Sequence, residues 1–450
     1  MASNNFWRNC MTTFVEPRLP RGMRDIMPQK MLRRRYVMRV IENVFERFGF
    51  EPLQTPALEL AQTLTGKYGP DAEKLIYDAR HREGKEELAL RYDLSVPLSR
   101  VVAMNPEVTK PFKRYQIAPV WRAERPQKGR YREFFQCDAD IVGASSMLAD
   151  AEIIAMIFTI LSELGFDAFV TKLNHRQVLT ALGEYSGVPP ARLGGLYRAI
   201  DKLEKIGREG VRQEMIANEI PDAAVEKILA LVALPVDDLH AWRETLRAYP
   251  RGVQGIAELE QLLGYARALG VKPARLQVDL TMVRGLEYYT GPIFETVVTE
   301  PKIGSLTGGG RYDGLIGLFS KNSLPATGTT IGIERIIDVM DELQMFPPNL
   351  GKTVTQVLVT VFDAERRAAA LALTMELRAA GVNAETWYDA DGLGKQLKYA
   401  AAKSIPYALI AGPDELAADA VTLRDLVTGE QTRLARGKIA AHLREKFSTA

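Results

Sequence analysis

The sequence predicts an α/β (α+β) protein: an antiparallel sheet flanked by helices, carrying a helical insertion and followed by a separate α/β domain. Three observations predict this fold. Residues 112–121 and 132–142 have strand length and strand patterning and are joined by a short loop, as in a hairpin. Residues 171–270 show amphipathic helical stretches with no strong strand. From residue 355 onward, short apolar strands alternate with helical segments.

Length and composition exclude several classes of protein. The 450 residues suggest about three domains, or two of which one is enlarged. Charged residues make up 25% of the chain, the globular average, which argues against a disordered or fibrous protein. No apolar run reaches the roughly 18–20 residues that span a bilayer, and Cys10 and Cys137 are too few for a disulfide framework. We therefore expect a soluble, cytoplasmic enzyme with no membrane partner.

The formal net charge of +2 hides an uneven distribution. Residues 16–39 contain eight Lys and Arg against two acids, and residues 110–133 again contain eight against two. The rest of the chain therefore carries a formal charge of −10. Two basic segments on an acidic body are typical of a phosphate-binding surface, although a solvated helix face would explain Arg33–Arg35 equally well.

The elements before residue 345 follow from periodicity. Helices are expected over 29–48 and 149–164, and each is followed by a glycine that ends it. The other expected elements are strands at 87–92, 276–283 and 292–299, a glycine cluster at 308–310 before a helix at 312–319, and a strand at 326–333 leading into a helix at 334–343.

A linker at 346–354 divides the chain into residues 1–345, with the insertion at about 171–270, and residues 355–450. The second part alternates strands and helices in the manner of an independent α/β module. Its expected elements are 356–362, 364–380, 384–388, 393–403, 406–411 and a hairpin-like segment at 420–435.

Several common site motifs are missing. The chain has neither a phosphate-binding G-x-x-x-x-G-K-[ST] loop nor a dinucleotide-binding G-x-G-x-x-G after a strand. The four histidines are scattered, and neither cysteine has a second ligand at metal-binding spacing. We expect no protein-bound metal.

Arginines at strand ends are the chemical signal that is present. Arg122 ends one strand, Arg284 precedes Gly285 at another, and Arg335 opens a helix. A buried arginine costs several kcal/mol unless it meets an anion. Internal ion pairs, such as Arg122 with Glu124 or Glu133, are one explanation. Three such arginines in one domain favour recognition of a polyphosphate.

These residues carry a resemblance to class II aminoacyl-tRNA synthetases. Arg122-x-Glu124, a loop and Arg130-x-x-x-Phe134 resemble their motif 2, residues 328–335 resemble motif 3, and the helix 29–48 resembles motif 1, the dimer-forming element. The narrower resemblance is to histidyl-tRNA synthetases. It rests on the segments 19–25, 201–207, 283–295 and 309–315, in the family's order over nearly the whole chain.

The resemblance implies a reaction and an ATP site. The family joins L-histidine to ATP as histidyl-adenylate, releasing pyrophosphate, and passes histidine to tRNA(His), releasing AMP. Arg122 and Arg284 are implied to bind the α-phosphate as catalytic residues, and Arg335 the γ-phosphate and adenine. Phe134 is implied to stack on adenine, beside Glu124 and Arg130, and Mg²⁺ to enter with the ATP.

The resemblance also implies a histidine pocket. Asp93, Ser95 and Gln136 match positions that hold the α-amino group, and Tyr289 and Asp140 match positions that face the imidazole. The remaining matches are Tyr288, Tyr312 and Arg284. On patterning alone, the three tyrosines are better explained as core aromatics.

The partners are implied in the same way: L-histidine, tRNA(His) and a second copy of the chain. Arg91-Tyr-Asp93-Leu-Ser95 and the ending Asp140 depart from the pattern common in bacterial members and resemble the eukaryotic-type branch. The basic loop after motif 2, with Arg125, Gln127 and Lys128, is the expected contact with the tRNA acceptor stem.

Two other functions compete with this interpretation. A synthetase-like regulatory subunit of histidine biosynthesis resembles the catalytic part, but it lacks the C-terminal domain and has a degraded histidine motif. A prolyl, threonyl or glycyl enzyme shares the C-terminal domain type but not the segment 283–295. Residues 355–450 and the intact segment 283–295 favour the histidyl enzyme.

Overall fold

The computed structural model describes residues 15–68, 70–127, 129–235, 237–283, 288–348, 350–389 and 391–448. The chain forms two compact units, one of residues up to Asp25 with Val37–Met345 and one of Ile26–Tyr36 with Phe346–Ala450. Helix α1 (Pro28–Arg47) belongs in part to each. Among the described residues, no helix combines the length and the apolar character needed to cross a membrane.

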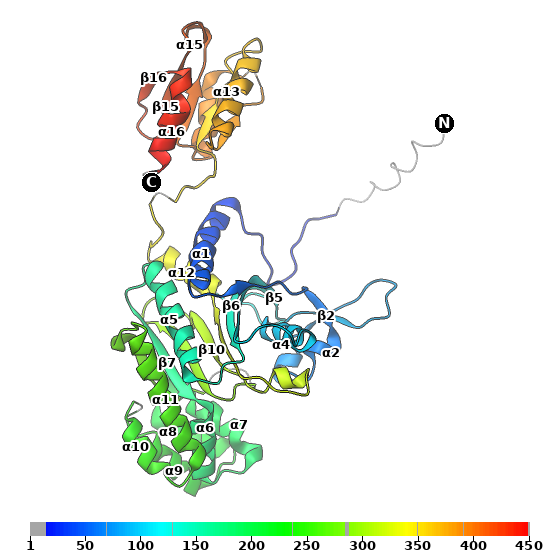
Figure 1. Ribbon diagram of the computed structural model, residues 1–450, viewed down its shortest axis with the longest axis vertical. Coiled ribbons are helices and arrows are strands. Elements are labelled where there is room, and N and C mark those ends of the chain that lie inside the picture. Colours follow the sequence, from blue (N-terminus) through cyan, green and yellow to red (C-terminus); the bar gives the residue numbers. More distant parts are fainter. Residues whose placement is uncertain are drawn as a thin grey trace. The chain divides into compact units, whose positions relative to one another are not determined.

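An eight-stranded sheet forms the centre of the first unit (Figure 1). Its order is β1 (Glu51–Pro52), β5 (Phe112–Trp121), β6 (Glu133–Val142), β11 (Ala326–Ile331), β10 (Thr307–Arg311), β9 (Pro292–Val298), β7 (Phe169–His175) and β8 (Leu276–Val278). The run from β5 to β7 is antiparallel, and β1 and β8 pair in parallel at the two edges. The antiparallel sheet and the expected hairpin of 112–121 and 132–142 are confirmed.

The register at the middle of this sheet decides which side chains meet. Asp140 of β6 lies opposite Arg114 of β5 and Gly328 of β11. Two residues earlier, Asp138 lies opposite Gln116 and Thr330. Because side chains alternate along a strand, Asp138 and Asp140 share one face of the sheet.

Helices flank the sheet. Helix α5 (Met147–Glu163) packs on β6, β10 and β11, and α11 (Pro250–Ala268) packs on β7, β9 and α5 (Figure 1). Ser146 begins α5 as its N-cap by accepting a bond from the Leu148 amide, and Gly165, at φ 85°, follows its end. The unit also contains helices α4 (Ser95–Met104) and α12 (Ile333–Glu342). A small three-stranded sheet has the order β2 (Leu58–Leu60), β4 (Leu88–Leu90) and β3 (Tyr77–Ala79). Two short helices, α2 (Ala61–Leu64) and α3 (Pro70–Glu73), lie between β2 and β3 in the sequence.

The helical segment after β7 is a cluster of short helices (Figure 1, green). It consists of α6 (Arg176–Ser186), α7 (Leu193–Ile200), α8 (Leu203–Ala217), α9 (Asp222–Leu231) and α10 (Leu239–Thr245). The expectation of no strand after residue 171 was wrong at its start, because Phe169–His175 pairs with β9 and β8 inside the main sheet.

The helix expected at 312–319 was also wrong. Only a short 3₁₀ turn, Ile316–Leu318, forms there. The glycine cluster before it lies inside β10, and Tyr312 continues that strand's bonding by donating its amide to Ala326. Pairing with β11 therefore takes up Tyr312, the first residue of the expected helix.

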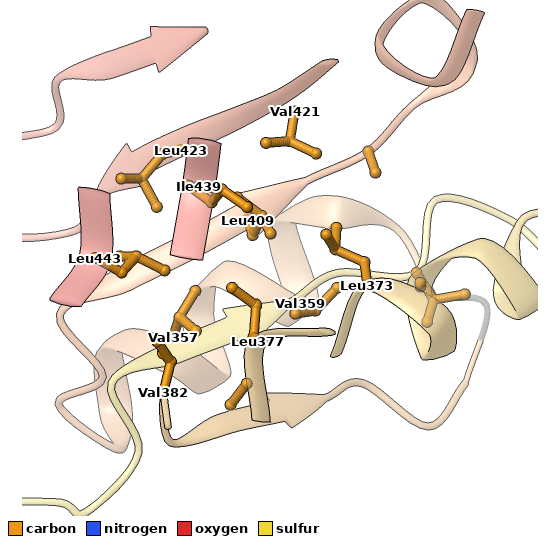
Figure 2. Packing of buried hydrophobic residues seen from close by; sticks show 14 residues of the cluster. Val357, Val359, Leu373, Leu377, Val382, Leu409, Val421, Leu423, Ile439 and Leu443 are labelled. Carbon is orange, nitrogen blue, oxygen red and sulfur yellow. The ribbon is translucent and has the colours of Figure 1, made fainter. Parts of the chain in front are cut away.

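The second unit has a five-stranded sheet in the order β13 (Ala384–Thr386), β12 (Val357–Val359), β14 (Tyr407–Ile410), β15 (Ala420–Asp425) and β16 (Gln431–Ala435). Its helices are α13 (Arg367–Ala379), α14 (Leu393–Ala402), α15 (Pro413–Ala417) and α16 (Ile439–Ser448). Figure 2 shows its core, where apolar side chains of α13 and α16 meet those of β12, β14 and β15. The expected alternation of strands and helices is present.

A buried ion pair ties α5 to β10 and generates a stability prediction. Asp150 and Arg311 are both nearly inaccessible, and the guanidinium also donates to the Ala144 carbonyl at 2.9 Å. Asp150→Asn should lower the free energy of unfolding by about 3–5 kcal/mol, because it leaves Arg311 without its buried carboxylate partner and with only the more exposed Asp313, 3.5 Å away. Urea denaturation followed by fluorescence would measure this. Glu226→Gln, which breaks an exposed pair with Arg212, should leave the midpoint unchanged; equal shifts for the two variants would contradict the prediction.

Candidate active site

One cavity of about 420 Å³ opens on the face of the main sheet that carries Asp138 and Asp140. It brings together residues of β6, β9, β10, β11 and α12, of the loop between β5 and β6, of the start of α4 and of the segments before α4 and β9. The predicted residues that line it are Asp93, Ser95, Arg122, Glu124, Arg130, Phe134, Gln136, Asp140, Tyr288, Tyr289, Tyr312 and Arg335. The predicted residues come from five separate stretches of the sequence, 93–95, 122–140, 288–289, 312 and 335, and meet in one place.

Arginines and aromatic rings form one end of the cavity. The Arg122 guanidinium lies 4.3 Å from the Tyr92 ring centroid and 5.2 Å from that of Phe134, and its Nε donates to the Tyr92 carbonyl at 3.0 Å. Glu124 is ion-paired with Arg130 at 2.9 Å and not with Arg122. The internal pair considered for Arg122 and Glu124 is thus absent from the ion pairs of the described residues.

Arg335 reaches the same end from the first turn of α12. Its Nη1 donates to the Ser305 carbonyl at 2.6 Å, which fixes the guanidinium at the cavity wall. The neighbouring Glu334 is ion-paired with Arg24 and accepts a bond from the Phe135 amide at 3.4 Å. The segment 19–25 is therefore attached to the start of motif 3.

Acceptor groups form the other end. The Asp93 carboxylate is buried, and its Oδ1 accepts from the Tyr68 hydroxyl at 2.9 Å and the Val96 amide at 3.1 Å. Burial raises the pKa of Asp93, and Arg122 acts in the opposite direction. Its Oδ2 has no hydrogen-bond partner among the described residues, so it can accept from a ligand.

Gln136 and Asp138 extend this acceptor surface along β6. The Gln136 amide donates to the Thr330 hydroxyl at 3.3 Å, and the Thr330 hydroxyl bonds to the Asp138 carboxylate. Gln136 Oε1 and Asp138 Oδ1 have no hydrogen-bond partner in the described part of the chain. Burial first, and Asp140 second, raise the pKa of Asp138 to about 7.

The Asp140 carboxylate has a contact at each of its two oxygens, unlike that of Asp138. Its Oδ1 accepts from the Tyr312 hydroxyl, and its Oδ2 lies 2.8 Å from Nη2 of Arg114, an arginine with no exposed surface. The same Nη2 donates to the Leu94 carbonyl at 3.0 Å. Burial raises the pKa of Asp140 while the Arg114 charge lowers it.

Three tyrosines close the acceptor end. The Tyr288 ring stacks edge-on against Tyr289 at 5.0 Å and Tyr312 at 5.7 Å between centroids. Burial raises the pKa of all three phenols, and nearby carboxylates add to the effect, so each keeps its proton and can donate.

Glycines make the room for this arrangement. A Cβ on Gly328 would lie 2.0 Å from Asp140 Oδ1, and one on Gly309 would lie 2.2 Å from the Gly328 carbonyl. Only glycine allows β10 and β11 to run beneath the carboxylates.

Four of the predicted site residues are not among the described residues that line the cavity. Arg284 and Lys128 lie outside the described residues. Arg125 and Gln127 are exposed and do not line the cavity; Gln127 bridges to Arg130 across the turn of the loop. Their predicted roles are untested.

Sequence reasoning missed Asp138, Tyr68 and Arg114. Alternation along β6 places residue 138 on the same face as the predicted 136 and 140, and this signal was available. The hairpin register that sets Arg114 opposite Asp140 also follows once the loop length is known. Tyr68 is distant from Asp93 in sequence and had no local signal.

The site can bind a polyanion at its arginine end and an N–H-rich group at its acceptor end. Together with the antiparallel sheet and a separate α/β unit, this arrangement defines a class II aminoacyl-tRNA synthetase. The histidyl-tRNA synthetase family model matches residues 22–336, and the anticodon binding domain model matches residues 356–446. The chain belongs to the histidyl-tRNA synthetase family.

Individual relatives agree with the family. The histidine–tRNA ligase of Cytophaga hutchinsonii is 41% identical over 443 residues, covering 93% of this chain and 97% of the relative. That of Gloeobacter violaceus is 42% identical over 447 residues, covering 92% and 95%. The crystal structure of histidyl-tRNA synthetase from a Nostoc species superposes with a TM-score of 0.84 at 32% identity, covering 96% of this chain and 100% of that one.

The glycine requirement can be tested by stability. Gly328→Ala should lower the free energy of unfolding by about 1–3 kcal/mol, because the new methyl group pushes Asp140 away from Arg114. Gly314→Ala is the matched control, since a Cβ there meets nothing within 4 Å. Chemical denaturation of both variants measures the difference, and an unperturbed Gly328→Ala protein would contradict the assigned packing.

Proposed function

We propose that this protein is a histidine–tRNA ligase. It attaches L-histidine to tRNA(His) in two steps, through histidyl-adenylate, releasing pyrophosphate and then AMP. The observation that carries the proposal is one cavity in which arginines face buried acceptors that have no hydrogen-bond partner among the described residues, in a chain 41% identical over 443 residues to a histidine–tRNA ligase.

The arginine end binds ATP, which enters as its magnesium complex. Attack by the histidine carboxylate on the α-phosphorus builds negative charge on the phosphate oxygens. Arg122 is pre-positioned by its bond to the Tyr92 carbonyl and donates to these oxygens without further reorganisation. Arg335 binds the departing phosphates, and Phe134 offers its ring to adenine.

The acceptor end binds histidine. The α-ammonium group has three N–H donors, and Asp93 Oδ2 and Gln136 Oε1, which accept from no described residue, can accept from it. The tyrosines and Asp140 surround the imidazole. An amino acid without ring nitrogens would leave these buried groups unpaired, and such sites reject the wrong substrate by about 10⁴–10⁵-fold.

The finer assignments stay predictions. These are the α-phosphate contact of Arg284, the acceptor-stem contacts of Arg125, Gln127 and Lys128, the Mg²⁺ ion that accompanies ATP, the homodimer and the cytoplasmic location. A regulatory subunit of histidine biosynthesis is disfavoured because the C-terminal domain is present. A structure described as such a subunit or a histidyl-tRNA synthetase, from Bacillus halodurans, shares the fold at 22% identity.

Exchange of ATP with labelled pyrophosphate tests the proposal directly. The purified chain should catalyse exchange that depends on L-histidine and is absent with proline, threonine or glycine. Charging of a tRNA(His) transcript by the same preparation tests the second step. No exchange with histidine, or faster exchange with another amino acid, would overturn the proposal.

Arg122→Ala should slow histidine-dependent exchange by about 10²–10³-fold, the usual loss for one pre-organised donor to transition-state charge. Arg243→Ala on α10 is the matched control, because that arginine pairs with Glu260 away from the cavity. Exchange rates at saturating ATP and histidine measure the effect. A rate for Arg122→Ala close to that of the control would assign Arg122 to structure.

A further inference from the structure

The segment 19–25 has no part in the proposed reaction, yet it lies against the loop between β5 and β6. The Gly22 carbonyl accepts from the Arg132 amide at 2.9 Å, and the Arg21 carbonyl lies 3.5 Å from Nη1 of Arg132. Nε of Arg132 donates to the Glu124 carbonyl at 3.0 Å. Arg132 therefore joins the segment to both the start and the end of this loop.

Gly22 makes this close approach possible. Its φ of 84° lies in the left-handed region, which glycine adopts at little cost. A Cβ at this position would lie 2.8 Å from Pro126 Cγ and 2.9 Å from Arg132 Cδ. Any side chain at residue 22 would therefore push the segment away from the loop.

Arg24 lies between two parts of the cavity wall. Its guanidinium is 3.5 Å from the centroid of the Tyr131 ring, and it is ion-paired with Glu334 at the start of α12. Tyr131 and Glu334 both line the cavity, whereas Arg24 is not among the described residues that line it. Glu334 also accepts from the Phe135 amide at 3.4 Å. Arg24 thus connects the loop with the helix that carries Arg335.

An arginine suits this position for a physical reason. A guanidinium can place its flat face on an aromatic ring while its N–H groups donate to a carboxylate. The ammonium group of a lysine cannot make both contacts in one geometry. The exposed fractions of the Arg24 and Glu334 side chains are 31% and 10%, so water screens this pair less than it screens a surface pair.

The residues beside these contacts belong to the end of the cavity that binds ATP. Arg130 precedes Tyr131 and is paired with Glu124 at 2.9 Å, and Arg335 directly follows Glu334. A nucleotide bound there meets side chains of both the loop and α12. The spacing of these two elements therefore affects how well their arginines fit the phosphates.

We propose that residues 21–24 form a clasp that holds the loop of motif 2 against motif 3, and that Arg24 is a positioning residue for the side chains that bind ATP. Arg24 acts through Tyr131 and Glu334. A loop held in place in advance loses less conformational freedom when the nucleotide binds. This inference rests on the proposed function, because it concerns the same ATP site.

Arg24→Gln tests the proposal because it removes the guanidinium and keeps a polar side chain. In pyrophosphate exchange, kcat/KM for ATP should fall about 10–100-fold, since misplacing a group by about 1 Å can cost about 10²-fold. The KM for histidine should change less than about twofold. Arg24→Lys, which keeps the charge, should restore only part of the loss. Arg18→Ala is the matched control, because Arg18 lies in the same part of the chain, is 77% exposed and pairs with Glu16.

Limited proteolysis gives a second readout that does not depend on activity. Trypsin should cleave the loop after Arg130 faster in Arg24→Gln than in Arg18→Ala, because the loop is no longer held against α12. Gly22→Ala should reproduce both effects through a different residue of the clasp. Thermal unfolding of each variant shows whether the fold is intact. The transitions should stay cooperative, since the clasp residues are exposed or half-buried.

Three outcomes would overturn the inference. The first is a kcat/KM for ATP in Arg24→Gln within about twofold of that in Arg18→Ala. The second is an equal loss for ATP and for histidine together with a lowered melting temperature, which would assign Arg24 to general stability. The third is unchanged use of ATP with a raised KM for tRNA(His), which would assign the clasp to tRNA binding. In each case histidine-dependent exchange by the unmodified protein would still stand, so failure of this inference is distinguishable from failure of the proposed function.

Discussion

The site depends on a buried arginine, Arg114, which neutralises carboxylates at the middle of the main sheet. Arg114 has no exposed surface and lies 2.8 Å from Asp140 on the adjacent strand. Burial raises the pKa of both aspartates on this face of β6, and the charge of Asp140 raises the pKa of Asp138 further. The charge of Arg114 opposes this rise at both carboxylates and so favours their ionised, acceptor form. The hairpin register that sets Arg114 opposite Asp140 is thus a functional constraint as well as a structural one.

The ion pair between Arg114 and Asp140 explains why glycines occupy the facing positions of β11 and β10. Carboxylates that project from β6 need space over β11, and Gly328 provides it where any side chain would overlap Asp140. Gly309 then allows β10 to approach β11. Such a sheet loses apolar packing at its centre, and Asp93, Gln136 and Asp138 keep acceptors unpartnered among the described residues. Unsatisfied buried groups lower stability, and they persist where a ligand satisfies them.

Much of the fold followed from local pattern, and the exceptions have physical reasons. The hairpin of β5 and β6 and the helices α1 and α5 were predicted within two residues because periodicity and terminal glycines act locally. Strand β7 was missed because it pairs with β9, more than a hundred residues later, and tertiary pairing decided its conformation. The cavity residues were predicted from motif resemblance. Asp138 could have been found from the alternation along β6, whereas Arg114 required the cross-strand register, which a single sequence does not display as a pattern.

The distribution of charge along β6 relates the fold to the proposed reaction. One end of the strand meets the arginines of motifs 2 and 3, and the other carries Asp138 and Asp140 beside a buried cation. A reaction between a triphosphate and an amino acid needs this polarity, because the phosphates and the ammonium group bear opposite charges and the attacking carboxylate must lie between them. The formal charge of +2 conceals this order, since the basic segment at 110–133 contributes Arg122 to the phosphate end and Arg114 to the acidic end. Arginines from one sequence cluster therefore have two different roles: Arg122 lines the cavity where the ligand binds, and the charge of Arg114 opposes the rise in pKa of the buried carboxylates.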